Sequence, residues 1–316
     1  MKAAPPRQAR GYLLIGGAAC CWGASAALGR AMFTSRLGLA LAPISPLVLT
    51  QGRISLAAVL LLPFLCISRR GRIGLPRRDF WGAVSLGVLG MSSSNYLYYL
   101  AIQRTNVVTA IILQYTAPIW VLVYLVARGR QRASSARVAA VVVALAGIAL
   151  TLGLLHSGVA LRLDPIGVIA ANLAAFAFAY YNIGGESLTR RADPVLVSLW
   201  MLVGAAVVWL AINPPWRLVR LAPAQWLFLL VFGLLATLAP TLLYISGLRF
   251  LDPTRAVVTS CLEPVSGILL AAVFLNETLV WSQVLGVLFV LAAIVLVQSG
   301  GAALRADGVG GPALHH

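Results

Sequence analysis

Glu263 is the residue best suited to chemistry, because it is an acid inside a long apolar segment. In a helix that begins at Pro253, a rise of ~1.5 Å per residue places it ~15 Å along the axis, near the centre of a ~30 Å hydrocarbon core. A carboxyl group at that depth must be paired, protonated or in contact with water. Three roles are open: carrying a coupling proton, holding a substrate amine, or making a structural hydrogen bond near Pro264.

The other seven acids have simpler explanations. Asp164, Asp193 and Asp252 each stand directly before a proline, which is typical of a helix N-cap followed by the first helical position. Asp79 precedes another apolar segment and is interpreted in the same way. The remaining three lie near a helix end, in a loop and in the C-terminal tail: Glu186, Glu277 and Asp307. Glu263 is thus the candidate coupling residue.

Arg53 is the corresponding cation, since it would lie ~10 Å inside a helix that begins at Pro46. Its guanidinium fork suits a substrate carboxylate. The alternatives are an ion pair with Glu263 or a side chain that reaches outward to the interface. Gln51 lies close by in sequence, on a different face of the same helix.

Aromatic and polar residues within the apolar segments are candidates to line a cavity. Phe176 and Tyr180 are four residues apart and share one helix face with Asn172. Helix packing is the alternative role for such aromatic residues. Further candidate binding residues are Trp22, Asn95, Tyr99, Gln114 and Ser260.

Other chemistries lack their residues. The four cysteines lie in apolar runs without Cys-x-x-Cys spacing, and the three histidines are His156 and the last two residues, so we expect no metal site and no cofactor. The sequence has no G-x-x-x-x-G-K-[ST] motif for ATP, no G-x-S-x-G and no H-E-x-x-H. We therefore expect no enzyme.

The composition then indicates what positions these residues. Of 316 residues 60% are hydrophobic and 10% charged, whereas a soluble domain is ~25% charged. Backbone groups in lipid must bond within the segment, so each apolar run is predicted to be a helix. The fold class is an all-α integral membrane protein with ten transmembrane helices, at about 12–33, 46–67, 80–102, 106–127, 137–155, 165–188, 195–212, 225–248, 255–274 and 281–298.

The basic residues indicate the orientation. Seventeen of the 24 lie in the N-terminus, the C-terminus and alternate loops, and five lie in the opposite set of loops. This excess predicts that both termini are cytoplasmic. The net charge of +16 is thereby explained by the membrane rather than by nucleic acid, which we do not expect as a partner.

An internal repeat divides the chain into residues 1–156 and 157–316. A shift of 146 residues places Tyr98 on Tyr244 and Pro118 on Pro264, and a shift of 154 places Trp22 on Phe176. Because five helices is an odd number, the second half must be inverted, as in secondary transporters. We expect the two prolines to be hinges and the two aromatic residues to meet at the pseudo-twofold axis.

The segment from Leu243 to Val297 resembles the second repeat of the drug/metabolite transporter superfamily, EamA type. The resemblance rests on Glu263-Pro264, the Asn276-Glu277 turn and Gly286. The first repeat departs from the pattern, because Ala117 replaces the acid before Pro118 and Arg130-Gln131 stands where the turn Glu would be. The resemblance implies a ten-helix bundle that exports small metabolites, often amino acids.

We therefore predict a secondary transporter of the inner membrane that exports small metabolites, most simply hydrophobic or aromatic amino acids, with protons as a candidate coupling ion. One alternative is a carrier of phosphorylated sugars or nucleotide sugars, which would need several inward cations. The other is a broad drug and metabolite exporter. The expected partners are the substrate and the lipid bilayer, and the expected state is a monomer or a weak dimer.

Overall fold

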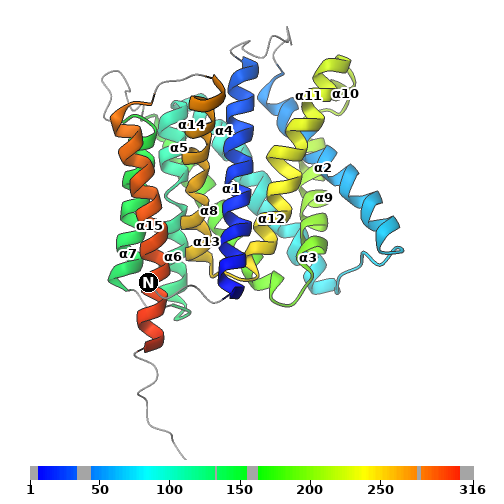
Figure 1. Cartoon of the computed structure of the whole chain (residues 1–316). Coiled ribbons are helices and arrows are strands. Elements are labelled where there is room, and N and C mark those ends of the chain that lie inside the picture. Colours follow the sequence, from blue (N-terminus) through cyan, green and yellow to red (C-terminus); the bar gives the residue numbers. More distant parts are fainter. Residues whose placement is uncertain (1–5, 34–43, 132–133, 155–162, 276–278, 307–316) are drawn as a thin grey trace, which may run out of the picture.

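The computed structural model describes residues 6–33, 44–131, 134–154, 163–275 and 279–306. Within these ranges the protein contains helices and no strand (Figure 1). The predicted turn at Asn276-Glu277 and the predicted repeat boundary at 156/157 lie outside the described residues. The elements in chain order are α1 (Pro6–Phe33), α2 (Pro46–Ser68), α3 (Arg77–Ser85), η1 (Leu86–Ser92), α4 (Ser93–Arg104), α5 (Val107–Gln114), α6 (Ala117–Ala127), α7 (Ser135–Thr151), α8 (Pro165–Thr189), α9 (Pro194–Ile212), α10 (Trp216–Val219), α11 (Pro223–Gly233), η2 (Leu234–Leu238), α12 (Ala239–Leu248), α13 (Pro253–Ser260), α14 (Leu262–Leu275) and α15 (Trp281–Ala306).

Each predicted apolar run is found as a helix or as consecutive helical pieces, so the all-helical prediction is confirmed. Among the described residues, eight helical segments are long and apolar enough to cross a membrane. Two of the predicted runs are not among these eight, because they are either too short or too polar. The segment from α3 to α4 is rich in serine and tyrosine, and α7 has 17 residues. The count of ten crossings stays a prediction.

Aspartates begin three of the helices, as predicted. The carboxylates of Asp164, Asp193 and Asp252 accept hydrogen bonds from backbone N–H groups in the first turn of α8, α9 and α13. The prediction for Asp79 is wrong. Pro76 is the N-cap residue of α3, and Asp79 lies within the first turn, where it accepts a hydrogen bond from Arg191.

The helices are interrupted at equivalent places in the two halves. The helix of residues 107–127 breaks at Tyr115 and Thr116, and the helix of residues 253–275 breaks at Cys261, 146 residues after Tyr115. A π-helical segment, η1, lies within the third predicted run; shifted by 146 residues it falls on residues 232–238, where η2 lies. Such broken and π-helical elements are typical of transporter sites.

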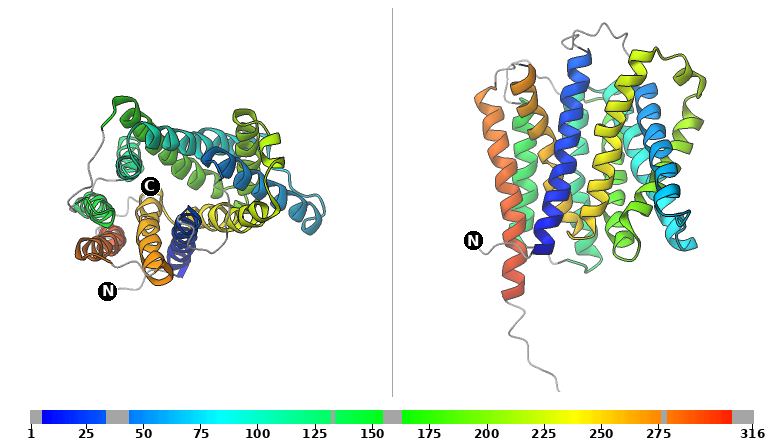
Figure 2. Two further views of the ribbon diagram at one scale, coloured as in Figure 1. Left: turned by 90° about the horizontal axis from the view of Figure 1, so that it is seen from above. Right: turned by 45° about the vertical axis from the view of Figure 1, so that its right-hand side comes forward.

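The two halves interlock. The first helix, α1, packs against α12 and α14, whereas α8 packs against α4, α5 and α6 (Figure 2). The approach of α1 to α14 is close because both carry glycine at the crossing: a Cβ on Gly23 would lie 2.6 Å from the backbone N of Gly267. In the same way Gly147 and Gly286 bring α7 against α15. Each half therefore covers the broken helix of the other.

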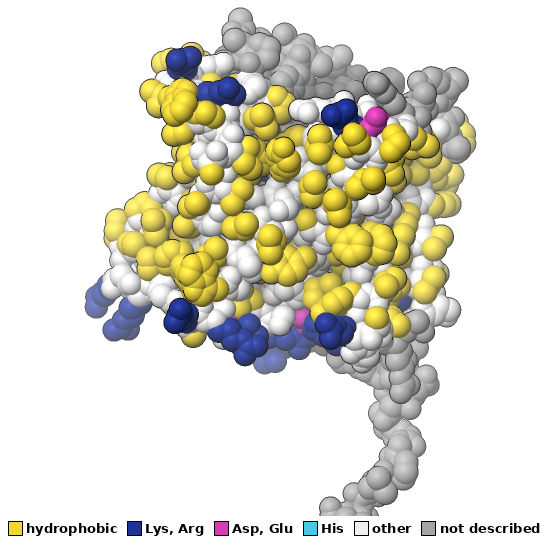
Figure 3. Space-filling view, turned by 180° about the vertical axis from the view of Figure 1, so that it is seen from behind, with side chains coloured by type: hydrophobic (Ala, Val, Ile, Leu, Met, Phe, Trp, Pro, Cys, Tyr) yellow, Lys and Arg dark blue, Asp and Glu magenta, His cyan; other side chains and the backbone are white. Residues whose placement is uncertain are grey.

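The bundle has two ends, which we call the inner face, where α1 begins, and the outer face, where α10 lies (Figure 1). The described part of α15 also ends on the inner side. Arginine side chains gather along that edge below a broad apolar band (Figure 3). This distribution agrees with the charge asymmetry of the loops.

Candidate functional site

A cavity of about 520 Å³ lies among α1, α2, α4, α5, α8 and α14. Its walls come mainly from the halves of these helices nearer the outer face. On α2, which runs inward from that face, the lining residues are Leu49 and Arg53, both in the first third of the helix. On α1, which runs outward, they are Trp22, Ser25, Ala26 and Ala27. The cavity thus extends from mid-bundle toward the outer face.

Glu263 lines this cavity directly after the break between α13 and α14. The side chain of Tyr115, from the break between α5 and α6, lines the same cavity and lies next to the Glu263 carboxylate. Tyr98 lines the same cavity and lies nearby. The two broken helices therefore meet at one acid–phenol pair, and the Glu263 side chain is half-buried because part of it faces the cavity.

Arg53 faces the same cavity from α2. Its Nη2 donates to Asn95 Oδ1 at 2.8 Å, and its Nη1 donates to Thr237 Oγ1 at 3.1 Å and to the Ala236 carbonyl at 3.3 Å. Ala236 and Thr237 belong to η2, and Asn95 follows η1. Arg53 is electrostatically coupled to Glu263 but makes no salt bridge with it. The predicted alternative of an Arg53–Glu263 ion pair is wrong, because the guanidinium is already bonded to both π-helical regions.

Several predicted residues are brought together at this cavity. Trp22 lines it with its ring 5.2 Å from that of Tyr244, and Tyr99 shares a hydrogen bond with Thr50 at 2.7 Å. Gln114 approaches Ser94 Oγ at 3.4 Å. The predicted residues that line the cavity are Trp22, Arg53, Asn95, Tyr99, Gln114, Ser260 and Glu263, together with the predicted hinges Pro118 and Pro264.

Gln51 does not line the cavity, which corrects the prediction. Its side chain is fully buried and pairs with Asn213, exchanging hydrogen bonds with the backbone carbonyl and the side-chain amide. An amide in an apolar interior needs a partner, and Asn213, which ends α9, provides one. Gln51 therefore joins α2 to α9.

The predicted cavity wall on α8 is also corrected. Phe176 is 49% exposed and lies 4.2 Å from the Trp120 ring, while Tyr180 is 41% exposed and bonds Ser85. Asn172 donates to the carbonyl of its own helix at Val168. Trp22 and Phe176 thus do not meet, and none of the three α8 residues lines the cavity.

The sequence-based site prediction left out several aromatic residues that line the cavity. Phe178 and Tyr181 occupy the opposite side of α8, with rings stacked 5.8 Å apart. Tyr98 and Tyr115 also line the cavity, close to Glu263. The sequence could have indicated Tyr115, because it lies three residues before Pro118 in the repeat partner of the Glu263 segment. Thr241 also lines the cavity, and its alignment with Asn95 in the repeat could have indicated it.

These features define a class of protein: a multi-pass membrane transporter, whose largely apolar cavity contains a few polar side chains at the meeting point of two broken helices. The chain belongs to the EamA-like transporter family, whose pattern matches residues 9–153 and again residues 165–299.

Similar proteins carry the same general description. An uncharacterized transporter of Archaeoglobus fulgidus is 26% identical over 74% of this chain and 80% of its own length. The uncharacterized inner membrane transporter YicL of Salmonella typhimurium is 23% identical over 92% of this chain and 95% of its own. A crystal structure with 18% identity aligns with a TM-score of 0.71 over 90% of this chain and 97% of its own, which shows the shared fold.

Proposed function

We propose that this protein exports small zwitterions with an apolar side chain, most simply hydrophobic or aromatic amino acids, by alternating access between two inverted five-helix repeats. The observation that supports this is the lining of one cavity, in the part of the chain that the structure describes, by one arginine and one glutamate among aromatic residues. Arg53 would take the substrate carboxylate and Glu263 the amine or the coupling proton. The rings of Trp22, Tyr98 and Phe178 would face the apolar side chain.

Phosphorylated sugars fit this cavity poorly. A phosphate group is bound by several N–H donors or cations, and among the described residues that line the cavity Arg53 is the one basic side chain. Three of its bonds are already made to Asn95, Thr237 and Ala236. The number and disposition of charges therefore favour a zwitterion over a dianion.

Counterflow in proteoliposomes tests the substrate class. Vesicles preloaded with unlabelled leucine or phenylalanine should accumulate the labelled amino acid, and an excess of either amino acid outside should compete. Glucose 6-phosphate at the same concentration should not compete, and protein-free vesicles supply the background. Competition by sugar phosphates with none by amino acids would overturn the proposal.

We also propose that both termini face the cytoplasm, because seventeen of the 24 basic residues lie in the termini and in the loops on that side. In a chain whose four cysteines are replaced by alanine, the introduced thiol of Arg72→Cys, after α2, should react only with a thiol reagent on the cytoplasmic side. The introduced thiol of Arg220→Cys, after α10, should react only with a thiol reagent added outside. Reaction of both from one side would exclude the proposed orientation.

A further inference from the structure

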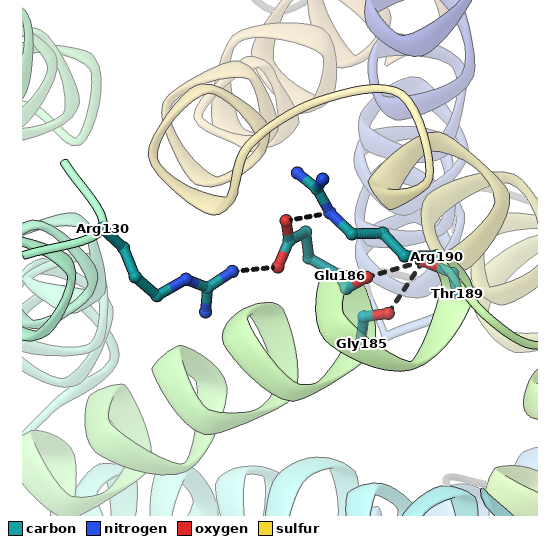
Figure 4. A network of polar contacts seen from close by, with 5 residues as sticks. All are labelled: Arg130, Gly185, Glu186, Thr189 and Arg190. Carbon is teal, nitrogen blue, oxygen red and sulfur yellow. Dashed lines mark hydrogen bonds and ion pairs between the residues drawn. The ribbon is translucent and has the colours of Figure 1, made fainter. Parts of the chain in front are cut away.

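The inner face is closed by charged pairs. Every ion pair between described residues lies at helix ends on this side, whereas the cavity lies in the outer half. One of the acids in these pairs is more deeply buried than the others. Glu186, near the end of α8, is 1% exposed and accepts hydrogen bonds from Arg130 Nη2 at 2.7 Å and from Arg190 Nε at 2.5 Å (Figure 4).

The Glu186 cluster connects different parts of the bundle. Arg190 lies one turn beyond Glu186, but Arg130 comes from the segment after α6. The next residue, Gln131, accepts a hydrogen bond from Thr254 of α13 at 3.0 Å. The end of α6, a helix of the first half of the chain, is thus tied to α8 and to α13, which are both helices of the second half.

The same three helices form the cavity above. Pro118 of α6, Tyr181 of α8 and Val257 of α13 line it. Between the cavity and the charged cluster lies an apolar layer in which Val121 and Leu125 of α6 pack with Ala179 and Val257. A path from the cavity to the inner face through this layer requires α6 to separate from α8 and α13.

We propose that Glu186 is the central residue of a latch, formed with Arg130 and by the Gln131–Thr254 contact, that holds the inner end of the transporter closed while the cavity is open to the outer face. A buried carboxylate that loses one of its partners is strongly destabilised unless water reaches it. The bonds in the latch therefore favour the closed inner end, and its opening must bring water to Glu186. The latch rests on the transporter class alone and not on the identity of the substrate.

The inner face also contains an ion pair that lies away from the three helices of the latch and can serve as a comparison. Arg69 at the end of α2 pairs with Asp193 at the start of α9 at 2.7 Å, with both side chains more than a third exposed. Neither α2 nor α9 belongs to the three helices that must separate. The substitution Arg69→Gln therefore removes an ion pair from the same face without touching the latch, and it serves as the control.

Cysteine accessibility measures the state of the inner end. In a chain whose native cysteines are replaced by alanine, Val257→Cys lies at the floor of the cavity, where the side chain is 2% exposed. In inside-out vesicles, a charged thiol reagent should modify this cysteine at least about tenfold faster when Glu186→Gln is added, since loss of a buried charge pair shifts such an equilibrium by that much or more. Arg130→Gln should act in the same direction, and Arg69→Gln should leave the rate unchanged.

A second reporter distinguishes opening from unfolding. Ala27→Cys lies in the cavity near the outer end of α1, so it should become less reactive from outside when the latch is removed, whereas an unfolded protein exposes both sites. Unchanged Val257→Cys reactivity in both Glu186→Gln and Arg130→Gln would overturn the proposal. Equal acceleration by Arg69→Gln, or increased reactivity of both reporters, would do the same, because either result reflects general loosening. None of these outcomes depends on which substrate is carried.

Discussion

The two broken helices have the same backbone plan and different chemistry. The α5–α6 break carries Tyr115, with Ala117 before Pro118; the α13–α14 break carries Cys261, with Glu263 before Pro264. Proline removes a backbone donor in each, and the cavity lies where the breaks face each other. The broken backbone occurs in both halves and allows either half to move. The acid before the proline occurs only at the α13–α14 break.

The difference shows how a duplicated fold obtains a polarised site. If both breaks carried an acid, two carboxylates would meet in an apolar interior and repel each other. Here a phenol from one half lies next to the carboxylate of the other, and Arg53 on α2 is the one basic side chain among the described lining residues. The described part of the site has one negative and one positive position, which is the pattern that a zwitterion needs.

The largest expected effect comes from removing the acid. Glu263→Gln should abolish accumulation driven by a pH gradient while it retains exchange of substrate for substrate, because exchange requires no net protonation cycle. Flux in proteoliposomes with and without the gradient measures both modes. Glu263→Asp, which retains a carboxyl group, should keep part of the gradient-driven transport.

Other results would assign Glu263 differently. Loss of both modes together would indicate that it binds the substrate amine and carries no proton. Reduced thermal stability with unchanged pH dependence would indicate a structural role. Wild-type values in both modes would remove Glu263 from the mechanism.

The next effect in size comes from removing the cation. Arg53→Gln should raise the apparent KM by about tenfold to a hundredfold, the effect of losing ~1.5–3 kcal/mol of charged hydrogen bonding. Arg53→Lys keeps the charge but cannot reproduce the fork that bridges Asn95 and η2, so it should retain more affinity than Gln and still melt earlier than wild type. An unchanged KM in Arg53→Gln, with only a lower Tm, would leave Arg53 as a structural bridge.

A smaller effect is expected where the two breaks touch. Tyr115→Phe removes the hydroxyl next to Glu263 and keeps the ring, so gradient-driven transport should fall by about tenfold, corresponding to ~1.4 kcal/mol, if that hydroxyl donates one hydrogen bond to the carboxylate during transport. Tyr181→Phe removes a hydroxyl from the same cavity at a position without a contact to Glu263, and it should have little effect. Equal losses in the two variants would contradict a specific role for the Tyr115 hydroxyl next to Glu263.

The sequence predicted the helices well, because apolar runs in lipid must be helical and because Asp-Pro pairs identify their first turns. It could not predict which side of α8 faces the cavity. Lipid is as apolar as a protein interior, so the periodicity that identifies a buried face in a soluble helix is weak here. Phe176 and Phe178 are equally apolar, and only packing distinguishes the lipid-exposed residue from the cavity residue.

The bonds of Arg53 were hidden for a different reason. One acceptor is the Ala236 carbonyl, which lies in a π-helical segment that no residue pattern specified. Glu186 was assigned to a helix end, which is correct in position, but its burial depends on Arg130 from a segment 56 residues away. Long-range pairing of this kind requires the fold to be known.

The smallest expected effect compares the repeat partners Trp22 and Phe176. Trp22 lines the cavity and contacts Tyr244, whereas Phe176 packs on Trp120 on the side of α8 that faces away from the cavity. Trp22→Ala should raise the apparent KM for leucine or phenylalanine by about tenfold, equivalent to ~1.4 kcal/mol of lost aromatic contact, without a comparable fall in the maximum rate. Phe176→Ala should leave KM unchanged and reduce thermal stability slightly. Competition assays in proteoliposomes and melting in detergent measure the two quantities on the same preparations. If Phe176→Ala raised KM as much as Trp22→Ala, the substrate would have to reach α8 from the side of Trp120, and the cavity between the broken helices would not be the binding site.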